Sequence, residues 1–484
     1  MTSATPGRRP GLPVLFLTLG LVPALFLLEG APPGAEGAPA QLPDPGARAH
    51  QAPETVAFVN VNVIPMDRER VLPGHTVLIQ DGRISALGPT DRIRIPDDAR
   101  RIEGRGRYLL PGLAEMHAHV PSAPDPPRED VEEVLFLYLA NGITTIRGML
   151  GSPYQVPLRE ELRRGEVLGP HFHVGAPSIR GPTAPTPQAA DSLVRAHHRD
   201  GYDFLKIHPG VPGDAWDRMV ETAREVGISW GGHVPADVGI HHAVETGMTT
   251  VDHLDGFEEV TRREGADRDD LATYYRATDP EKLEELVRFL ASHRVWLVPT
   301  QYLWNHLRGY PDADSLLALP EFRYISPQLR ENYRRRAQAN RENPAITPES
   351  HRAHAEMRQD FLRAAHEAGV PILMGTDSPQ LFNVTGFALH REIPLMVDAG
   401  MSHYDVLLSG TRTVADYVEE ALGQPGDFGQ VAPGMRADLV LVEGNPLESL
   451  DVLRDPAGVM VGGRWVSRDE IQAGLEAIAA RYGG

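Results

Sequence analysis

Two histidines, His117 and His119, stand two positions apart at the end of an apolar stretch of the chain. Side chains of a β-strand alternate between its two faces, so a strand here would place both imidazoles on one face. Two imidazoles at that spacing can hold one metal ion, whereas a lone histidine on a strand is more often a core residue. The pair therefore predicts a metal site, with a purely structural role as the alternative.

Other residues of metal-ligand type stand near the ends of later apolar runs: Lys206, His233, His253 and Asp377. Structure alone could explain any one of these positions. Ligand types on five different strands that meet at one edge are much harder to explain in that way. Because the chain has no cysteine, nitrogen and oxygen atoms must hold any metal ion.

The elements that would position these residues follow from the alternation of short apolar runs with longer helical patterns between about residues 109 and 411. Eight runs are predicted to be strands: 113–120, 142–149, 171–176, 204–208, 228–234, 249–254, 295–300 and 372–377. Eight parallel strands in series close a (β/α)8 barrel, also called a TIM barrel, whose active site lies at the carboxyl ends of the strands. The long gaps after residues 254 and 300 predict inserted helices over the barrel mouth.

Short apolar runs with turn residues also occur near both ends of the chain, and they predict strands at residues 54–64, 76–79, 83–87, 437–442 and 458–466. The dipeptides Asp81-Gly82 and Gly462-Gly463 are typical of hairpin turns. The predicted fold class is therefore α/β, with a TIM barrel between two β regions.

The 484 residues include 47 Lys and Arg against 66 Asp and Glu, which gives a formal net charge of −19. This charge disfavours nucleic acid and anionic membrane surfaces as partners. We therefore expect a small-molecule substrate.

Residues 1–40 have the layout of a secretory signal peptide, with Arg8-Arg9 before an apolar run and Ala38-Pro39-Ala40 after it. Export to the periplasm or the extracellular space is expected, with no membrane contact after cleavage. The alternative is an uncleaved N-terminal membrane anchor, which Pro13 and Pro23 within the apolar run disfavour.

Several segments resemble the amidohydrolase superfamily, and in particular its imidazolonepropionase and Xaa-Pro or Xaa-Arg dipeptidase branch. They are Leu110-Pro111-Gly112-Leu113 before His117 and His119, Gly142-Ile143-Thr144-Thr145, Phe204-Leu205-Lys206-Ile207, Gly232-His233, Val251-Asp252-His253, Gly375-Thr376-Asp377-Ser378, Pro433-Gly434 and Ala437-Asp438-Leu439-Val440. The resemblance implies a composite β-sandwich, built from both chain ends, beside the barrel. The implied domains are a signal peptide (1–40), the first part of the sandwich (41–108), a barrel with helical insertions (109–411), and the second part with a C-terminal helix (412–484).

The same resemblance implies two divalent metal ions. His117, His119 and Asp377 would hold one ion, and His233 and His253 would hold the other. Zinc is the expected metal, although manganese, cobalt and iron accept the same ligand types.

Lys206 would bridge the two ions after carboxylation by carbon dioxide, since a carbamate offers two oxygens and an ammonium offers no lone pair. A metal-bridging hydroxide would attack the substrate carbonyl, and Asp377 would act as the general acid and base. Two alternatives stay open: Lys206 as an inward ion pair beside a single metal ion, and Asp377 as a ligand only.

Three further residues are candidates for substrate contact. His208 stands two positions after Lys206 and would share its face, and Tyr302 follows the seventh predicted strand. Arg147, near the end of the second strand, could pair with a substrate carboxylate, although a structural salt bridge is the stronger reading.

We therefore expect an exported metal-dependent amidohydrolase that cleaves the amide bond of a dipeptide or an N-acyl amino acid. The alternative is hydrolysis of a cyclic amide, a lactone or another ester at the same site. A noncatalytic binding protein on the same fold is a third reading, which the complete ligand set disfavours. Homo-oligomers occur in the family, but no residue pattern identifies an interface here.

Overall fold

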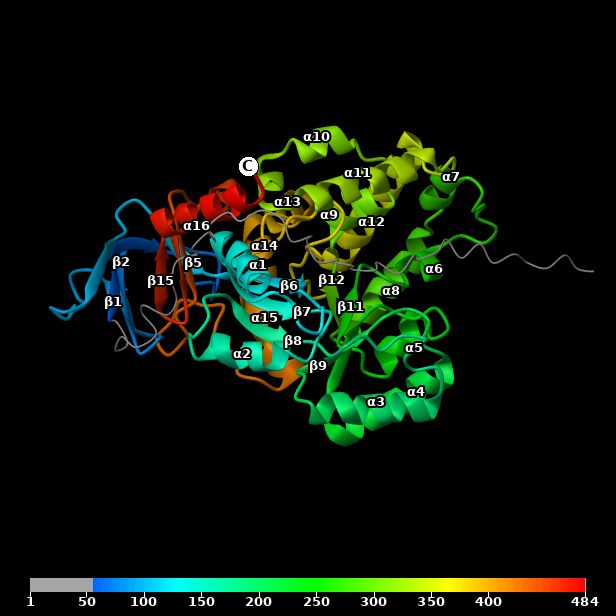
Figure 1. Ribbon diagram of the computed structural model, residues 1–484, viewed down its shortest axis with the longest axis horizontal. Coiled ribbons are helices and arrows are strands. Elements are labelled where there is room, and N and C mark those ends of the chain that lie inside the picture. The colour runs from blue at the N-terminus through cyan, green and yellow to red at the C-terminus, as the bar shows by residue number, and fades with distance from the viewer. Residues whose placement is uncertain (1–54, 484) are drawn as a thin grey trace, which may run out of the picture. The chain divides into compact units, whose positions relative to one another are not determined.

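The computed structural model of the protein describes residues 55–483, so the predicted signal peptide lies outside the described residues. Among residues 55–483, every helix is too short or too polar to cross a lipid bilayer. Seven runs in the middle of the chain form parallel strands, all but β10 labelled in Figure 1: β6 (Leu113–Ala118), β7 (Ile143–Gly148), β8 (His171–Val174), β9 (Phe204–Ile207), β10 (Ser229–Gly232), β11 (Thr250–Asp252) and β12 (Trp296–Val298).

The predicted eighth strand closes the ring without forming a regular ladder. Ile372 pairs with β12 and Ser378 pairs with β6, each as an isolated bridge, and the backbone N–H of Asp377 donates to the His117 carbonyl at 2.9 Å. A bridge between Gly175 and Phe204 joins β8 to β9 on the opposite side. The TIM barrel is thereby complete, but residues 372–378 form an irregular strand, in which Asp377 has a φ of 63°.

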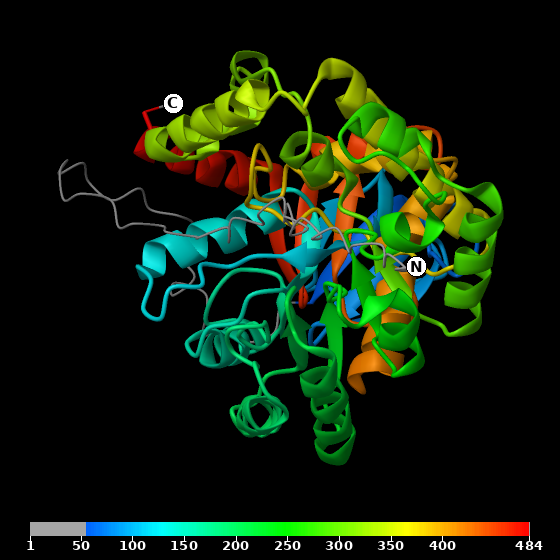
Figure 2. The same ribbon diagram turned by 90° about the vertical axis from the view of Figure 1, so that its right-hand side faces the viewer.

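Helices surround the barrel strands, as the turned view in Figure 2 shows. Ten of them follow the βα rhythm or close the barrel at its end: α1 (Arg128–Ala140), α2 (Gln155–Arg163), α3 (Pro187–Arg199), α4 (Gly213–Val226), α5 (Gly239–Glu245), α8 (Pro280–Ser292), α12 (Pro348–Glu367), α13 (Leu389–Asp398), α14 (His403–Ser409) and α15 (Arg412–Leu422). Several begin at a sequence signal, a Ser, Thr or Asp N-cap followed by proline, as Thr186-Pro187 does for α3.

The long gaps of the sequence contain the predicted inserted helices. They are α6 (Phe257–Thr261), α7 (Leu271–Arg276), α9 (Gln301–Leu307), α10 (Ala313–Leu317), the 3₁₀ helix η1 (Pro320–Tyr324) and α11 (Pro327–Glu342). An apolar cluster that includes Phe322, Tyr333 and Phe382 packs α10, η1 and α11 against the loop that follows Asp377. The insertions therefore contact the segment that carries a predicted ligand.

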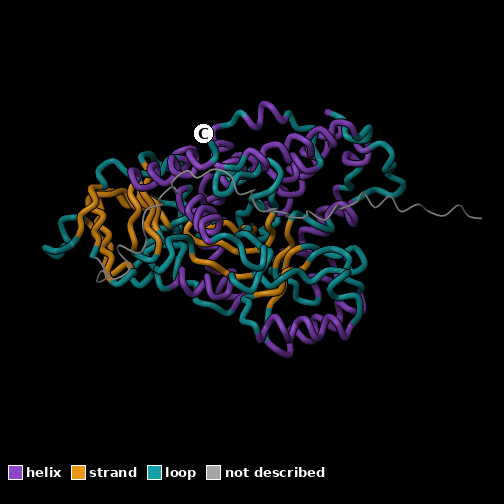
Figure 3. Tube along the Cα trace, in the orientation of Figure 1, coloured by secondary structure: helices purple, strands orange, loops and turns teal. Residues whose placement is uncertain are grey.

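Both ends of the chain contribute to one eight-stranded sheet, which confirms the prediction of a β domain built from both ends. Its strands run in the order β15-β14-β13-β5-β1-β2-β3, with β4 beside β1. Figure 3 shows these strands gathered at one end: β1 (Val56–Val63), β2 (Leu72–Gln80), β3 (Arg83–Pro89), β4 (Arg100–Glu103), β5 (Tyr108–Pro111), β13 (Leu439–Val442), β14 (Gly458–Val461) and β15 (Arg464–Ser467).

The junction between the sheet and the barrel sets the position of the His117 strand. β5 pairs with β13 in antiparallel register and runs through Gly112 directly into β6. A side chain at Gly112 would collide with Thr144, since a Cβ at this position would lie 2.2 Å from the Thr144 hydroxyl oxygen. The 3₁₀ helix η2 (Leu450–Arg454) and the helix α16 (Arg468–Arg481) complete the C-terminal part.

Buried histidines outside the barrel mouth predict a loss of stability in acid. His390 in α13 is 3% exposed, and burial together with the charge of Arg454 lowers its pKa from 6.5 to about 3. Between these pH values the unfolded chain binds a proton that the folded chain does not. The free energy of unfolding therefore falls as the pH falls, by at most about 1.4 kcal/mol per pH unit from this residue.

We expect His390→Gln to reduce this slope, since glutamine cannot take up the proton. Urea unfolding at pH 7, 6 and 5, in the presence of a chelator, measures the slope for each protein. The control is His198→Gln, the same exchange at an exposed position. Equal slopes for the parent and His390→Gln would contradict the prediction.

Candidate metal centre

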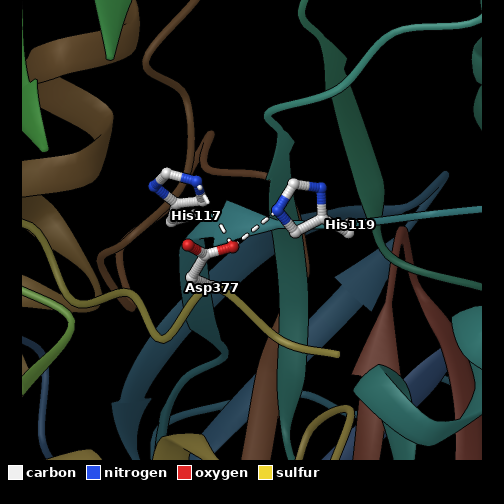
Figure 4. A group of neighbouring side chains, drawn as sticks. All are labelled: His117, His119 and Asp377. Carbon is white, nitrogen blue, oxygen red and sulfur yellow. Dashed lines mark hydrogen bonds and ion pairs between the residues drawn. The ribbon is translucent and has the colours of Figure 1, made fainter. Parts of the chain in front are cut away.

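His117, His119 and Asp377 form a compact group that could hold one metal ion. One ligand atom from each lies within 4.8 Å of the other two, and all three residues are buried. His119 Nε2 lies 2.6 Å from Asp377 Oδ1, and His117 Nε2 lies 3.6 Å from the same oxygen. Figure 4 shows the two imidazoles and the carboxylate directed toward one another. The two-residue spacing brings the imidazoles together as the strand geometry predicts.

The other predicted ligands lie beside this group. The His253 ring is centred 4.6 Å from the His117 ring and 4.5 Å from the His233 ring. His253 Nε2 is also 3.7 Å from Asp377 Oδ2. Lys206 is fully buried on β9, and its Nζ has no hydrogen-bond partner among the described residues. The structure therefore brings all six predicted ligand residues to the same mouth of the barrel.

Unusual backbone conformations place two of these side chains. His253 and Asp377 have φ values of 65° and 63°, and Thr300, which contacts His253, has a φ of 49°. Non-glycine residues in this left-handed region are strained, and such strain is concentrated at functional sites. At His253 the reversal ends the alternation of β11, so that Asp252 and His253, although adjacent in sequence, both reach the barrel interior.

The electrostatics of the site favour ligand-competent protonation states. Burial lowers the pKa values of His117 and His253 well below 6.5, so both imidazoles are neutral and keep a lone pair. Burial alone would raise the pKa of Asp377, but His117 and His119 outweigh it and lower the value to about 2. Burial also lowers the pKa of Lys206, which favours the neutral amine.

Neighbouring side-chain oxygens orient two of the histidines. Nδ1 of His233 lies 2.7 Å from Asp255 Oδ2, and Nδ1 of His253 lies 2.8 Å from Thr300 Oγ1. In both residues the contact occupies Nδ1 and leaves Nε2 for a ligand role. Neither Asp255 nor Thr300 was predicted from the sequence, although each is close in sequence to a predicted strand end.

Two buried residues that were not predicted from the sequence hold the strands that carry the ligands. Glu115 accepts from the backbone N–H groups of His117 (3.1 Å) and Thr376 (2.7 Å) and from the Thr376 hydroxyl (2.7 Å). The Tyr138 hydroxyl donates to the carbonyl of Ser378 at 2.9 Å. Glu115 thereby ties β6 to the irregular eighth strand, and Tyr138 ties α1 to the end of that strand. A glutamate inside an otherwise apolar strand is the sequence signal that could have revealed the first.

The structure corrects the predicted substrate contact of Arg147. Its side chain is fully buried, and Nη2 donates to both Asp252 carboxylate oxygens at 3.1 Å. Its other donors contact Met116, Thr250 and Tyr417. No N–H group of the guanidinium is left to bind a substrate. Arg147 therefore forms the structural salt bridge that was the alternative prediction.

The other two predicted substrate contacts lie in different settings. The His208 ring is centred 4.9 Å from that of His233, and its Nδ1 lies 2.7 Å from Ser178 Oγ. Tyr302 is half-buried and packs edge-on against His306, with the ring centres 4.6 Å apart. Trp304, two positions later, is the aromatic residue that reaches the site, with its ring 5.9 Å from that of His253.

The donor set fits divalent metal ions. Neutral imidazole nitrogens and an ionised carboxylate are the ligands that zinc and similar cations accept in hydrolases. The unpartnered Nε2 of His253 and Nζ of Lys206 are buried polar atoms, which normally have a partner. A cation and a modified lysine would supply those partners.

Comparison with known proteins finds matches to the sequence and to the fold. The family described as "Amidohydrolase family" matches residues 108–466. A segment covering 22% of the chain is 32% identical to an adenine deaminase of Ruegeria pomeroyi. The chain spans 17% to 38% of the length of the curated adenine deaminases of Ruegeria pomeroyi, Rhizobium meliloti and Paracoccus denitrificans.

Two solved structures share the fold over nearly their full length. A bottromycin amidohydrolase covers 93% of this chain and 95% of its own, with a TM-score of 0.70 and 23% identity. A putative prolidase from Bifidobacterium longum covers 88% of this chain and 100% of its own, with a TM-score of 0.62 and 23% identity. At 23% identity these likenesses show that the chain shares the fold, a barrel with a β domain.

Proposed function

The chain belongs to the amidohydrolase family, whose enzymes act on carbon–nitrogen bonds, and from this premise we propose that it hydrolyses the amide bond of a dipeptide or an N-acyl amino acid. The observation that carries the proposal is the buried His117, His119 and Asp377 group with His233, His253 and Lys206 beside it. The fold shared with a putative prolidase supports a peptide-like substrate.

His117, His119 and Asp377 would hold one divalent ion, and His233 and His253 would hold a second. When bound, the ions would polarise the substrate carbonyl and lower the pKa of water at the site. Asp377 would take a proton from that water and return it to the leaving amine. Its Oδ1 contacts His119 Nε2 and accepts from the Gln380 amide, so Oδ2, which faces His253, is the oxygen available for the proton.

Lys206 would carry the carbamate. Its amine is fully buried, its pKa is lowered chiefly by burial, and a neutral amine is the form that reacts with carbon dioxide. Gly232 on the next strand leaves room for the group, because a Cβ there would lie 3.2 Å from Lys206 Nζ.

Donors around Trp304 favour a substrate with a free carboxylate. The buried Nε1 of Trp304 has no hydrogen-bond partner among the described residues, and neither has the buried ring of His354, 6.4 Å away. The Arg308 guanidinium lies 5.0 Å from the Trp304 ring centre. It lies 3.2 Å from Glu258, and the Arg308 side chain is 40% exposed. An indole N–H and a guanidinium can bind the carboxylate of an amino acid together.

A second candidate is hydrolysis of a ring carbon–nitrogen bond or loss of ammonia from a ring. The partial match to adenine deaminases favours it. The same site could also open a lactone or another ester, because activated water attacks either type of acyl carbon. The groups around the leaving atom, and not the metal ligands, would decide among these reactions.

The test is product release by zinc-loaded mature protein from dipeptides, N-acyl amino acids, cyclic amides, lactones and adenine. Amine, ammonia and proton release are recorded together, so that each reaction type gives a distinct signal. We expect amine release from dipeptides or N-acyl amino acids, and much slower release when their carboxylate is amidated. Ammonia from adenine, or proton release from lactones alone, would replace the proposal by the second candidate.

We further propose that the protein is exported, on the basis of the signal-peptide pattern in residues 1–40. Fractionation of cells that make the full chain, with N-terminal sequencing of the product, tests this. A cleaved protein outside the cytoplasm is expected, and an uncleaved protein in the membrane fraction would favour the anchor.

A further inference from the structure

Asp252 and Arg147 form a fully buried ion pair inside the barrel, and both side chains are 0% exposed. Burial of two charges is costly and is seldom repaid by their mutual attraction alone. The pair is therefore weak evidence for added stability. A role connected with the neighbouring ligands is the alternative to consider.

Arg147 is anchored to the strand that carries the ligands. Its Nε donates to the carbonyl of Met116, the residue before His117, at 2.7 Å. Nη1 donates to the hydroxyl groups of Thr250 (3.0 Å) and Tyr417 (3.2 Å). With two more contacts from Nη2 to Asp252, every part of the guanidinium is fixed. The carboxylate of Asp252 is held by contacts to a rigid partner.

Asp252 contacts His117 in turn. Its Oδ2 lies 2.9 Å from His117 Nδ1, although the ring is not aligned for a linear hydrogen bond. His233 and His253 also have an oxygen close to Nδ1, in their case at hydrogen-bond geometry, with Nε2 left for a ligand role. His117 differs from these two because its oxygen partner is itself clamped by a buried arginine.

We propose that Arg147 and Asp252 are positioning residues, which fix the His117 ring with its proton on Nδ1 and its Nε2 directed at the metal ion. The inference rests on the proposed metal centre. A carboxylate at Nδ1 selects the tautomer and makes Nε2 a stronger electron-pair donor to the metal ion. Loss of such partners typically weakens metal binding about 10- to 100-fold.

The chain contains a chemically matched control. Asp438 is 3% exposed and contacts both Arg436 and His171, with Oδ1 of Asp438 3.1 Å from His171 Nε2. This Arg–Asp–His group lies where β8 meets the C-terminal part of the chain, and none of its members is a predicted ligand. Loss of a carboxylate charge there costs stability without removing support from a ligand.

The experiment compares Asp252→Asn with Asp438→Asn. Zinc affinity is measured by competition with a chromophoric chelator, cobalt absorption reports the ligand geometry, and thermal unfolding without metal reports stability. We expect Asp252→Asn to weaken zinc binding about 10- to 100-fold and to shift the cobalt spectrum, and Asp438→Asn to leave zinc affinity within about twofold of the parent. Unchanged affinity and spectrum in Asp252→Asn would overturn the proposal.

Arg147 is tested through its coupling to Asp252. If Arg147 acts through Asp252, the double variant Arg147→Met, Asp252→Asn binds zinc more tightly than the product of the two single effects predicts. If the two single effects simply multiply in the double variant, Arg147 does not act through Asp252, and the proposal holds for Asp252 only. If Arg147→Met does not fold, Arg147→Lys gives the same comparison, with the charge retained but without the paired hydrogen bonds of the guanidinium. A parent that binds no metal would instead refute the proposed function.

Discussion

Asp377→Asn is expected to lower the rate of hydrolysis by about 10³-fold, the largest effect of any single substitution proposed for this chain. Asparagine keeps an oxygen that can contact His119 and accept from Gln380, so the local structure should persist. It loses the negative charge and cannot carry a proton from water to the leaving amine. Steady-state turnover of the best substrate in the panel, with metal content measured on the same sample, gives the result.

The control for this substitution is again Asp438→Asn, at a buried aspartate whose charged partners, Arg436 and His171, are not predicted ligands. It should keep turnover close to that of the parent. If Asp377→Asn retains appreciable turnover with its metal bound, Asp377 is a ligand only, and another group carries the proton. If the variant loses both its turnover and its metal ion, the result shows the ligand role but does not test the proton transfer. The assay is then repeated with excess zinc.

Lys206→Ala is expected to remove one of the two metal ions proposed for the site and to lower turnover roughly 10²- to 10³-fold. The lysine side chain is fully buried, so alanine leaves a space beside His233 and His253. A small carboxylic acid such as acetate can occupy that space and present two oxygens, as the carbamate would. Added acetate should therefore restore part of the activity and the second metal ion.

Lys206→Met is the matched control, because methionine fills the space and offers no oxygen. Acetate should not rescue it. If Lys206 is only an ion-pair partner of Asp252, whose Oδ2 lies 3.9 Å from Nζ, neither variant should change metal content. Two metal ions and full activity in Lys206→Ala would rule out the bridging role.

Apolar runs were sufficient to predict the barrel strands. Each of the seven regular strands lies inside its predicted range, as β10 at Ser229–Gly232 lies inside residues 228–234. The eighth departs from the prediction because its last residues serve the site. There the Thr376 N–H and hydroxyl bind Glu115, and Asp377 adopts a left-handed conformation that an apolar pattern does not encode.

The candidate site was predictable where a ligand follows strand alternation, as His117 and His119 do. It was less so where the backbone breaks alternation. A strict period of two assigns Asp252 and His253 to opposite faces, but the φ of 65° at His253 brings both inward. Because strict alternation does not direct Asp252 and His253 to the same face, the sequence did not identify Asp252 as the partner of Arg147. Nor could the sequence show whether the Arg147 side chain is buried beneath the ligands or exposed at the barrel mouth.

The contacts between the barrel and the C-terminal part also determine when the site can form during synthesis. Arg147 donates to the hydroxyl of Tyr417, 270 residues later, and β5 pairs with β13 just before the chain enters the His117 strand. A ribosome releases the chain from its N-terminus, so the early strands must wait for these late partners. Contacts of such long sequence separation also slow folding. The newly made protein should consequently acquire its metal ions only after synthesis is complete, and the compartment in which folding ends would determine which metal it receives.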